Sequence, residues 1–251
     1  MSLDTYKFRC SSLGKLMTNA RSKSETLSET TKSHLLECWI EYQYGRKKEI
    51  DSKYLEKGKA QEAESMTLYS LVKRQFFKKN NERLTNPWIT GEPDLFIGKD
   101  IVEAEKIIDL KTSWSLHTFM DAKFSPIEKD YMYQLQGYMA LTGAKEAALV
   151  YCLVDTPDEL IADEKRRLAY KMGVIDEQHN PEYIAACREI DKNSYFGDIP
   201  QIDRVFERDI KRDDKIIESI YSRVDECRKW IAETFYSNEV LTEQLEKSIA
   251  V

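Results

Sequence analysis

The chain has 251 residues, of which 41% are hydrophobic, and a formal net charge of −6 at pH 7. A chain of this length can bury roughly three quarters of the surface that its unfolded form exposes, so one large core is sufficient. The net charge argues against a protein that coats nucleic acid through a general positive field. It is compatible with a nucleic-acid enzyme that gathers carboxylates around metal ions and keeps its basic residues in local clusters.

The composition also bears on location and redox state. The sequence has no run of about 18 apolar residues that would cross a bilayer, and its start, MSLDTYKFRC, lacks the apolar core of a signal peptide. Its five cysteines are widely scattered and form no C-x-x-C pair. We therefore expect no membrane partner, a cytoplasmic location and reduced, structural thiols.

The first half of the chain changes from helical to strand-like patterns. Apolar spacing predicts a helix from about residue 29 to 44, with Ser28 as candidate N-cap and Gly45 as its stop. A second helix is expected over residues 53–74. The stretch NPWITGEPDLFIGKD then predicts two strands of a hairpin, and a third strand follows at residues 106–112.

The second half begins with a helix through DYMYQLQGYMALTG, which ends at Gly143. The near-continuous apolar run at residues 147–154 predicts a central strand that is buried on both faces. The remaining expected elements are helices near 158–172 and 181–192, a strand around Val205 and Phe206, and a long helix from about 216 to 235. This order predicts a single mixed α/β domain.

The strand at residues 106–112 carries two charged side chains. Side chains alternate between the faces of a strand, so Asp109 and Lys111 share one side while Ile108 and Leu110 face the other. We expect the core to take the second pair, Asp109 and Lys111 to lie together on the open face, and a hairpin to return Asp94 beside them. Two carboxylates and a backbone carbonyl form the all-oxygen set that Mg²⁺ prefers. The lysine would hold a water or a phosphate oxygen next to the metal.

These short patterns have an ordinary alternative explanation, since a turn aspartate and a polar strand recur by chance. Two further features bear on the choice. Glu62 lies on the expected second helix, although a lone helical glutamate is most often solvated. Gln134 and Tyr138 are four residues apart and therefore share one helical face.

Four motifs occur in an order that resembles the PD-(D/E)XK nucleases, and within them the YqaJ-like viral recombination exonucleases related to lambda exonuclease and the RecB nuclease domain. They are G-K-x-x-E (Gly58 to Glu62), G-x-P-D (Gly91 to Asp94), D-x-K (Asp109 to Lys111) and Q-x-x-x-Y (Gln134 to Tyr138). The match covers about residues 54–154, under half of the chain. The resemblance implies a restriction-endonuclease-like core with a central mixed sheet flanked by helices, within one domain of residues 1–251 that has helical decorations at both ends.

The resemblance also implies roles for the matching residues. The implied metal ligands are Glu62, Asp94, Asp109 and the carbonyl of Leu110. The implied supporting residues are Lys111, which would orient the attacking water, Gln134 and Tyr138. The residues expected to bind DNA are Arg9, Ser11 and Ser12, from a looser match near the N-terminus, and Lys57 and Lys59, from a local basic cluster.

The function that follows from the resemblance is a Mg²⁺-dependent deoxyribonuclease, with Mn²⁺ as a substitute. We expect an exonuclease that degrades linear double-stranded DNA from its ends, 5′ to 3′, in phage-type recombination within a phage or bacterial system. An endonuclease or nickase of the same fold and a catalytically silent DNA-binding scaffold are the alternatives. The implied partners are duplex DNA ends, a single-strand annealing protein and further copies of the chain in a homo-oligomeric ring.

Overall fold

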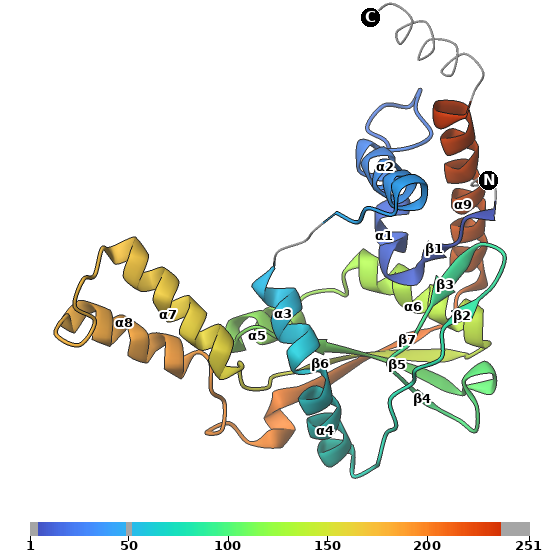
Figure 1. Ribbon diagram of the computed structural model, residues 1–251. Helices are drawn as coiled ribbons and strands as arrows, with labels where there is room; N and C mark the ends of the chain where they lie inside the picture. The colour runs from blue at the N-terminus through green and yellow to red at the C-terminus, as the bar shows by residue number, and fades with distance from the viewer. Residues whose placement is uncertain (1–4, 49–51, 237–251) are drawn as a thin grey trace, which may run out of the picture.

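The computed structural model describes residues 5–48 and 52–236 (Figure 1). Its helices are α1 (Leu13–Leu16), α2 (Glu29–Tyr44), α3 (Lys53–Ala60), α4 (Glu62–Lys73), α5 (Leu116–Phe124), α6 (Lys129–Thr142), α7 (Asp158–Met172), α8 (Pro181–Lys192) and α9 (Asp214–Phe235). Its strands are β1 (Phe8–Arg9), β2 (Leu84–Thr85), β3 (Ile89–Gly91), β4 (Leu95–Ile97), β5 (Lys106–Thr112), β6 (Glu146–Cys152) and β7 (Val205–Lys211).

A four-stranded mixed sheet in the order β4-β5-β6-β7 forms the centre of the molecule. β5 and β6 pair in parallel, and β4 and β7 pair antiparallel to them at the two edges. A smaller sheet in the order β1-β3-β2 lies beside it. The predicted α/β class, with a mixed sheet flanked by helices, is confirmed.

Helices cover both faces of the central sheet (Figure 1). On one face, Ile107 of β5 and Leu149 of β6 pack in a cluster with residues of α6 and α9. On the other face, Ile108 packs with Leu68 and Tyr69 of α4. The expectation that one face of β5 stays open is therefore wrong, because α6 closes the face that carries Asp109. β5 is buried from Ile107 to Asp109 and becomes partly exposed from Leu110 to its carboxyl end.

Local sequence signals located several elements closely. The side chain of Ser28 accepts a hydrogen bond from the backbone N–H of Thr31 at the start of α2. Gly45 ends that helix with a left-handed φ of 64°, a conformation that glycine adopts without the steric cost of a Cβ. The expected second helix is divided at Gln61, whose φ and ψ are −108° and 13°, into α3 and α4. Because of this break, the axes of α3 and α4 run in different directions.

The predicted hairpin between WIT and LFI is wrong. β3, from the first run, pairs with β1 and β2, whereas β4, from the second, pairs with β5. The chain between them is held by Asn80, whose backbone N–H donates to Asp94 O and whose side chain donates to Pro93 O. Asp94 therefore enters β4 directly beside β5.

α7 and α8 pack against each other as a helical hairpin that stands to one side of the sheet in Figure 1. All five cysteines are free thiols. Among the helices of residues 5–48 and 52–236, none combines the length and the apolar character that crossing a bilayer requires.

Candidate active site

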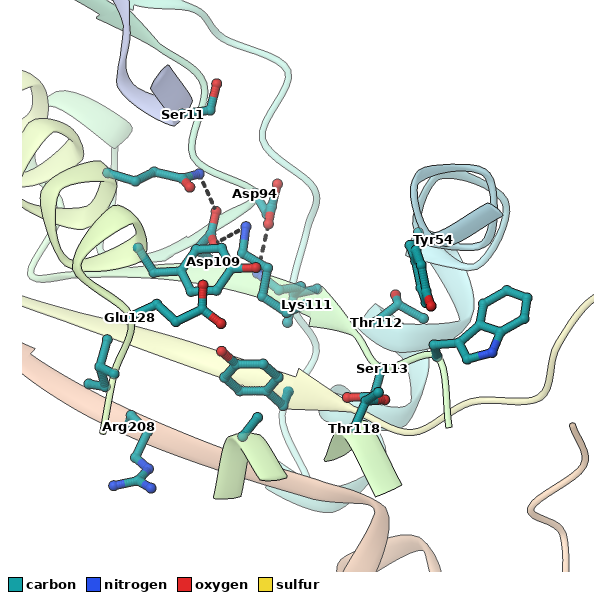
Figure 2. Close-up of a pocket in the computed structure, with 18 of the residues that line it drawn as sticks. Ser11, Tyr54, Asp94, Asp109, Lys111, Thr112, Ser113, Thr118, Glu128 and Arg208 are labelled. Carbon is teal, nitrogen blue, oxygen red and sulfur yellow. Dashed lines mark hydrogen bonds and ion pairs between the residues drawn. The ribbon is translucent and has the colours of Figure 1, made fainter. Parts of the chain in front are cut away.

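Two aspartates and a lysine from β4 and β5 meet at one place (Figure 2). Asp94 lies at the head of β4, and its Oδ2 accepts a hydrogen bond of 2.7 Å from the backbone N–H of Leu110. Asp109 is only 2% exposed, and its Oδ2 lies 2.6 Å from Lys111 Nζ. The antiparallel pairing of the two strands thus brings together residues that are fifteen or more positions apart in the sequence.

Gln134 and Tyr138, the Q-x-x-x-Y pair of α6, hold the side chain of Asp109 in place. Gln134 Nε2 donates to Asp109 Oδ1 at 3.1 Å and to Tyr138 Oη at 3.0 Å. Both side chains belong to the buried face of α6, and Tyr138 is 5% exposed. Gln134 therefore orients the carboxylate of Asp109 through one oxygen and leaves the other toward Lys111.

The charges of this cluster are not balanced. Burial and the nearby charge of Asp109 raise the pKa of the Asp94 carboxyl above its usual value. Burial is the largest single influence on Lys111 and alone would lower its pKa, but the charge of Asp109, the close polar contact with it and the charge of Asp94 together raise that pKa. Lys111 approaches Asp109 Oδ2 closely, yet this buried oxygen has no hydrogen bond of good geometry. A cation coordinated by both carboxylates would satisfy that oxygen and relieve their repulsion, so the residues fit Mg²⁺.

Glu62, the third carboxylate that the resemblance implies, is paired with a lysine instead of with the two aspartates. It begins α4 and lines the same cavity as Asp94 and Asp109, but its Oε1 pairs with Lys79 Nζ at 2.8 Å. Within the described part of the chain, no three His, Cys, Asp or Glu side chains are grouped to hold a metal ion. Of the implied metal ligands, the structure brings together the two aspartates, with the Leu110 backbone next to them.

The cluster lies in a cavity of about 810 Å³, within the range of roughly 300–1,000 Å³ that is usual for ligand sites. One wall comes from α3 and the chain after β5, and another from α6 and β7. The lining residues that the sequence did not single out include Tyr54, Trp114, Glu128, Tyr131 and Arg208.

Tyr131 is one of these unpredicted residues. Lys111 Nζ lies 4.8 Å from the centroid of its ring, an arrangement in which the ring face attracts the ammonium. Tyr131 precedes Gln134 by three residues on α6, so it shares a helical face with the predicted residue. That spacing was the available sequence signal.

The N-terminal residues expected to bind DNA lie close to the cluster. Ser11 lines the main cavity, and with Arg9, Lys47 and Arg83 it also lines a neighbouring hollow. Arg9 pairs with Glu41 at 2.8 Å but keeps a half-exposed side chain. Ser12 differs, because its hydroxyl donates to the Arg9 carbonyl at 2.8 Å. The fold thus places Ser11 at the main cavity and Arg9 at the neighbouring hollow.

Lys57 does not fit the role of a DNA contact that its sequence cluster suggested. It is 1% exposed, and its Nζ donates to the Trp114 carbonyl at 3.0 Å. Burial lowers the pKa of its ammonium to about 8. The prediction is wrong for Lys57 because α3 turns this side chain inward. Lys59 lines the cavity, and its contact with DNA stays a prediction.

Gly91 leaves room for Tyr138 next to the cluster. A Cβ at position 91 would lie 2.7 Å from the Tyr138 ring and 2.8 Å from Cys10 Sγ. We expect Gly91→Ala to lower the free energy of unfolding by about 1–3 kcal/mol, because this part of the core must shift to admit a methyl group. Gly197→Ala is the matched control, since nothing lies within 4 Å of its Cβ position. Equal denaturant midpoints for the two variants would contradict the close packing at Gly91.

No protein-family model matches the sequence, and no curated protein matches it. Among solved structures, the chain is similar to a phage-related exonuclease from Haemophilus somnus 129PT. The two are 27% identical with a TM-score of 0.70, over 96% of this chain and 97% of the other. It also shares the fold of an alkaline exonuclease from Laribacter hongkongensis, with 16% identity and a TM-score of 0.59 over 98% and 95% of the chains. That enzyme has also been solved in complex with dAMP.

The chain therefore has the PD-(D/E)XK fold, and the predicted class is confirmed. More particularly, its resemblance to the phage-type exonucleases is confirmed by the neighbour from Haemophilus somnus, which matches nearly the full length of both chains. The similarity to these exonucleases supports the expectation that the chain is a nuclease.

Proposed function

We propose that the protein is a metal-dependent deoxyribonuclease that degrades linear duplex DNA from its ends in the 5′ to 3′ direction. The observation that carries the proposal is the meeting of Asp94, Asp109 and Lys111 at the open end of β5, inside a cavity large enough for a nucleotide. The similarity to a phage-related exonuclease supports it. An alkaline exonuclease of the same fold binds dAMP, which supports a site that holds a nucleotide.

In this mechanism Asp94, Asp109 and the Leu110 carbonyl would hold Mg²⁺, or Mn²⁺ in its place. Such an ion would supply charge neutralisation at the phosphate and a lower pKa for the attacking water. Lys111 stays protonated, because its pKa is raised, and donates a hydrogen bond to the attacking water or to a phosphate oxygen. The water oxygen bonds to phosphorus as the bond to the 3′ oxygen breaks. The water gives up one proton to solvent and the 3′ oxygen takes one up, which leaves a 5′ phosphate and a 3′ hydroxyl.

Preference for an end follows from the distribution of charge. The net charge of −6 disfavours binding along the length of a duplex. The hollow lined by Arg9, Lys47 and Arg83 adjoins the main cavity through Ser11. Glu41 and Glu92 pair with these three basic side chains, so a terminal phosphate would bind there in place of the two carboxylates. A single-strand annealing partner and a homo-oligomeric ring, both implied by the resemblance, belong to the same proposal.

The experiment that tests this function compares linear duplex DNA with covalently closed circles. We expect end-labelled linear DNA to release mononucleotides and leave single strands, while the circles stay intact. Removing the 5′ phosphate should slow digestion, because the basic hollow then loses its anion. Comparable cutting of the circles, or internal fragments from the linear duplex, would reject the exonuclease and favour an endonuclease of the same fold.

A further inference from the structure

An aromatic pair forms the wall of the cavity away from α6. Tyr54 of α3 and Trp114, which follows β5, have ring centroids 5.3 Å apart at an interplanar angle of 74°. Both line the cavity that contains Lys111. Figure 2 shows Tyr54 beside Thr112, with Lys111 between it and Glu128. The mechanism described above leaves this pair without a role.

We propose that Tyr54, supported edge-on by Trp114, is the surface on which an unpaired nucleobase stacks next to the reacting phosphodiester. The inference rests on the proposed function, because it deepens the substrate of the same site. Stacking needs an exposed ring, and Tyr54 is 58% exposed. Among large apolar side chains that are exposed in the described ranges, only Tyr54 and its neighbour Leu55 line this cavity.

Trp114 is held from two sides. Lys57 Nζ donates to the Trp114 carbonyl at 3.0 Å, and Lys53 Nζ lies 4.5 Å from the centroid of the Trp114 ring. Lys53 also pairs with Glu164 at 3.1 Å. Burying a lysine is costly, and anchoring the chain that carries Trp114 gives Lys57 a structural purpose. A ring that is already fixed loses little freedom when a base stacks beside it.

The charges around the pair suit a nucleic-acid strand. Lys59, in the last turn of α3, lines the cavity, and Lys53 lies next to Tyr54 at the start of the same helix, so backbone phosphates that follow α3 would meet positive charge at both of its ends. A cationic groove that contains an aromatic ring is the usual arrangement for single strands, and it tolerates any base because every base has a π face. Bases inside a duplex are stacked on each other, so the ligand class is an unpaired nucleotide.

The test uses a short single-stranded oligonucleotide that carries 2-aminopurine, a base whose fluorescence falls when it stacks. Binding is measured at low salt in EDTA, so that the strand stays intact. We expect the wild-type protein and Tyr54→Phe to quench the fluorescence, since both keep a ring at this position. Tyr54→Leu should lose the quenching and weaken binding by about tenfold, within the range measured for aromatic residues that stack on bases.

Tyr170→Leu is the matched control, because Tyr170 is 91% exposed on α7 and does not line the cavity. It should quench like the wild type, and thermal melting should show that all variants are folded. Unchanged quenching and affinity in Tyr54→Leu, or no quenching by a wild-type protein that digests linear DNA, would overturn the stacking surface. A wild-type protein that digests no DNA would instead overturn the proposed function.

Discussion

Lys111→Met and Asp109→Asn are each expected to slow DNA hydrolysis by about 10²- to 10³-fold, the usual effect of removing one group that stabilises the transition state. Lys111 is the cation nearest to Asp109, at 2.6 Å, and the ring of Tyr131 helps to hold it there. Asp109 is the carboxylate that Gln134 orients. Single-turnover rates on linear duplex DNA measure the effect without a contribution from product release.

The two variants should differ in stability. Lys111→Met leaves the buried carboxylates of Asp94 and Asp109 without their nearest cation, so we expect a clear loss in the free energy of unfolding. Asp109→Asn removes one of the two like charges and nearly preserves the shape of the side chain, so the loss should be smaller. Asp109→Ala is a poorer test of catalysis than Asp109→Asn, because Asp109 is only 2% exposed and truncating a buried side chain would also disturb the packing.

Asp209→Asn serves as the control for charge on the same sheet. Asp209 lies on β7, its side chain is 63% exposed, and it pairs with Lys106 rather than with the cluster. Full activity is expected for this variant. A folded Lys111→Met protein with near-normal activity would show that the site is assigned to the wrong residues.

Elements defined by local signals were predicted closely from the sequence. α2 has its capping serine at one end and a glycine at the other, and both act within one turn of the helix. After Glu146, β6 is a continuous apolar run, which is typical of a strand buried on both faces. The spacing of apolar residues in α9 is equally local, and this helix was expected at about residues 216–235.

Features that depend on distant partners were not predicted. Alternation along β5 placed Asp109 on an open face, but α6 covers that face, and no pattern within the strand reports this. Lys57 looked like a surface cation because its partner, the carbonyl of Trp114, lies 57 residues away. The pairing of β4 with β5 instead of β3 likewise depends on how the chain is held at Asn80.

The candidate site divides in the same way. The sequence order of the motifs selected Asp94, Asp109 and Gln134. In the fold, Gln134 donates to Asp109, and Asp94 accepts from the backbone N–H of Leu110, next to Asp109. It could not select Tyr54, because an isolated tyrosine on a short helix carries no distinguishing spacing. It also could not anticipate that Lys79 would compete for Glu62.

Removal of divalent metal is expected to abolish hydrolysis. Mg²⁺ or Mn²⁺ should restore it, and Ca²⁺ should not, because its longer and looser coordination misplaces the attacking water. Metal binding can also be measured without activity. Because the ion would bind the folded state, Mg²⁺ should raise the melting temperature of the wild-type protein, and Asp94→Asn should lose most of that rise. Unimpaired cleavage in excess EDTA would reject this mechanism.

The same measurement decides what Glu62 does. If Glu62 leaves Lys79 to join the metal shell, Glu62→Gln should weaken the Mg²⁺-dependent rise in melting temperature, whereas Lys79→Met should strengthen it by freeing the carboxylate. Glu64→Gln is the matched control on the same helix, since Glu64 lines a different hollow. If Glu62→Gln and Glu64→Gln respond to Mg²⁺ alike, Glu62 is no ligand, and the ion is held by the two aspartates and backbone oxygen alone.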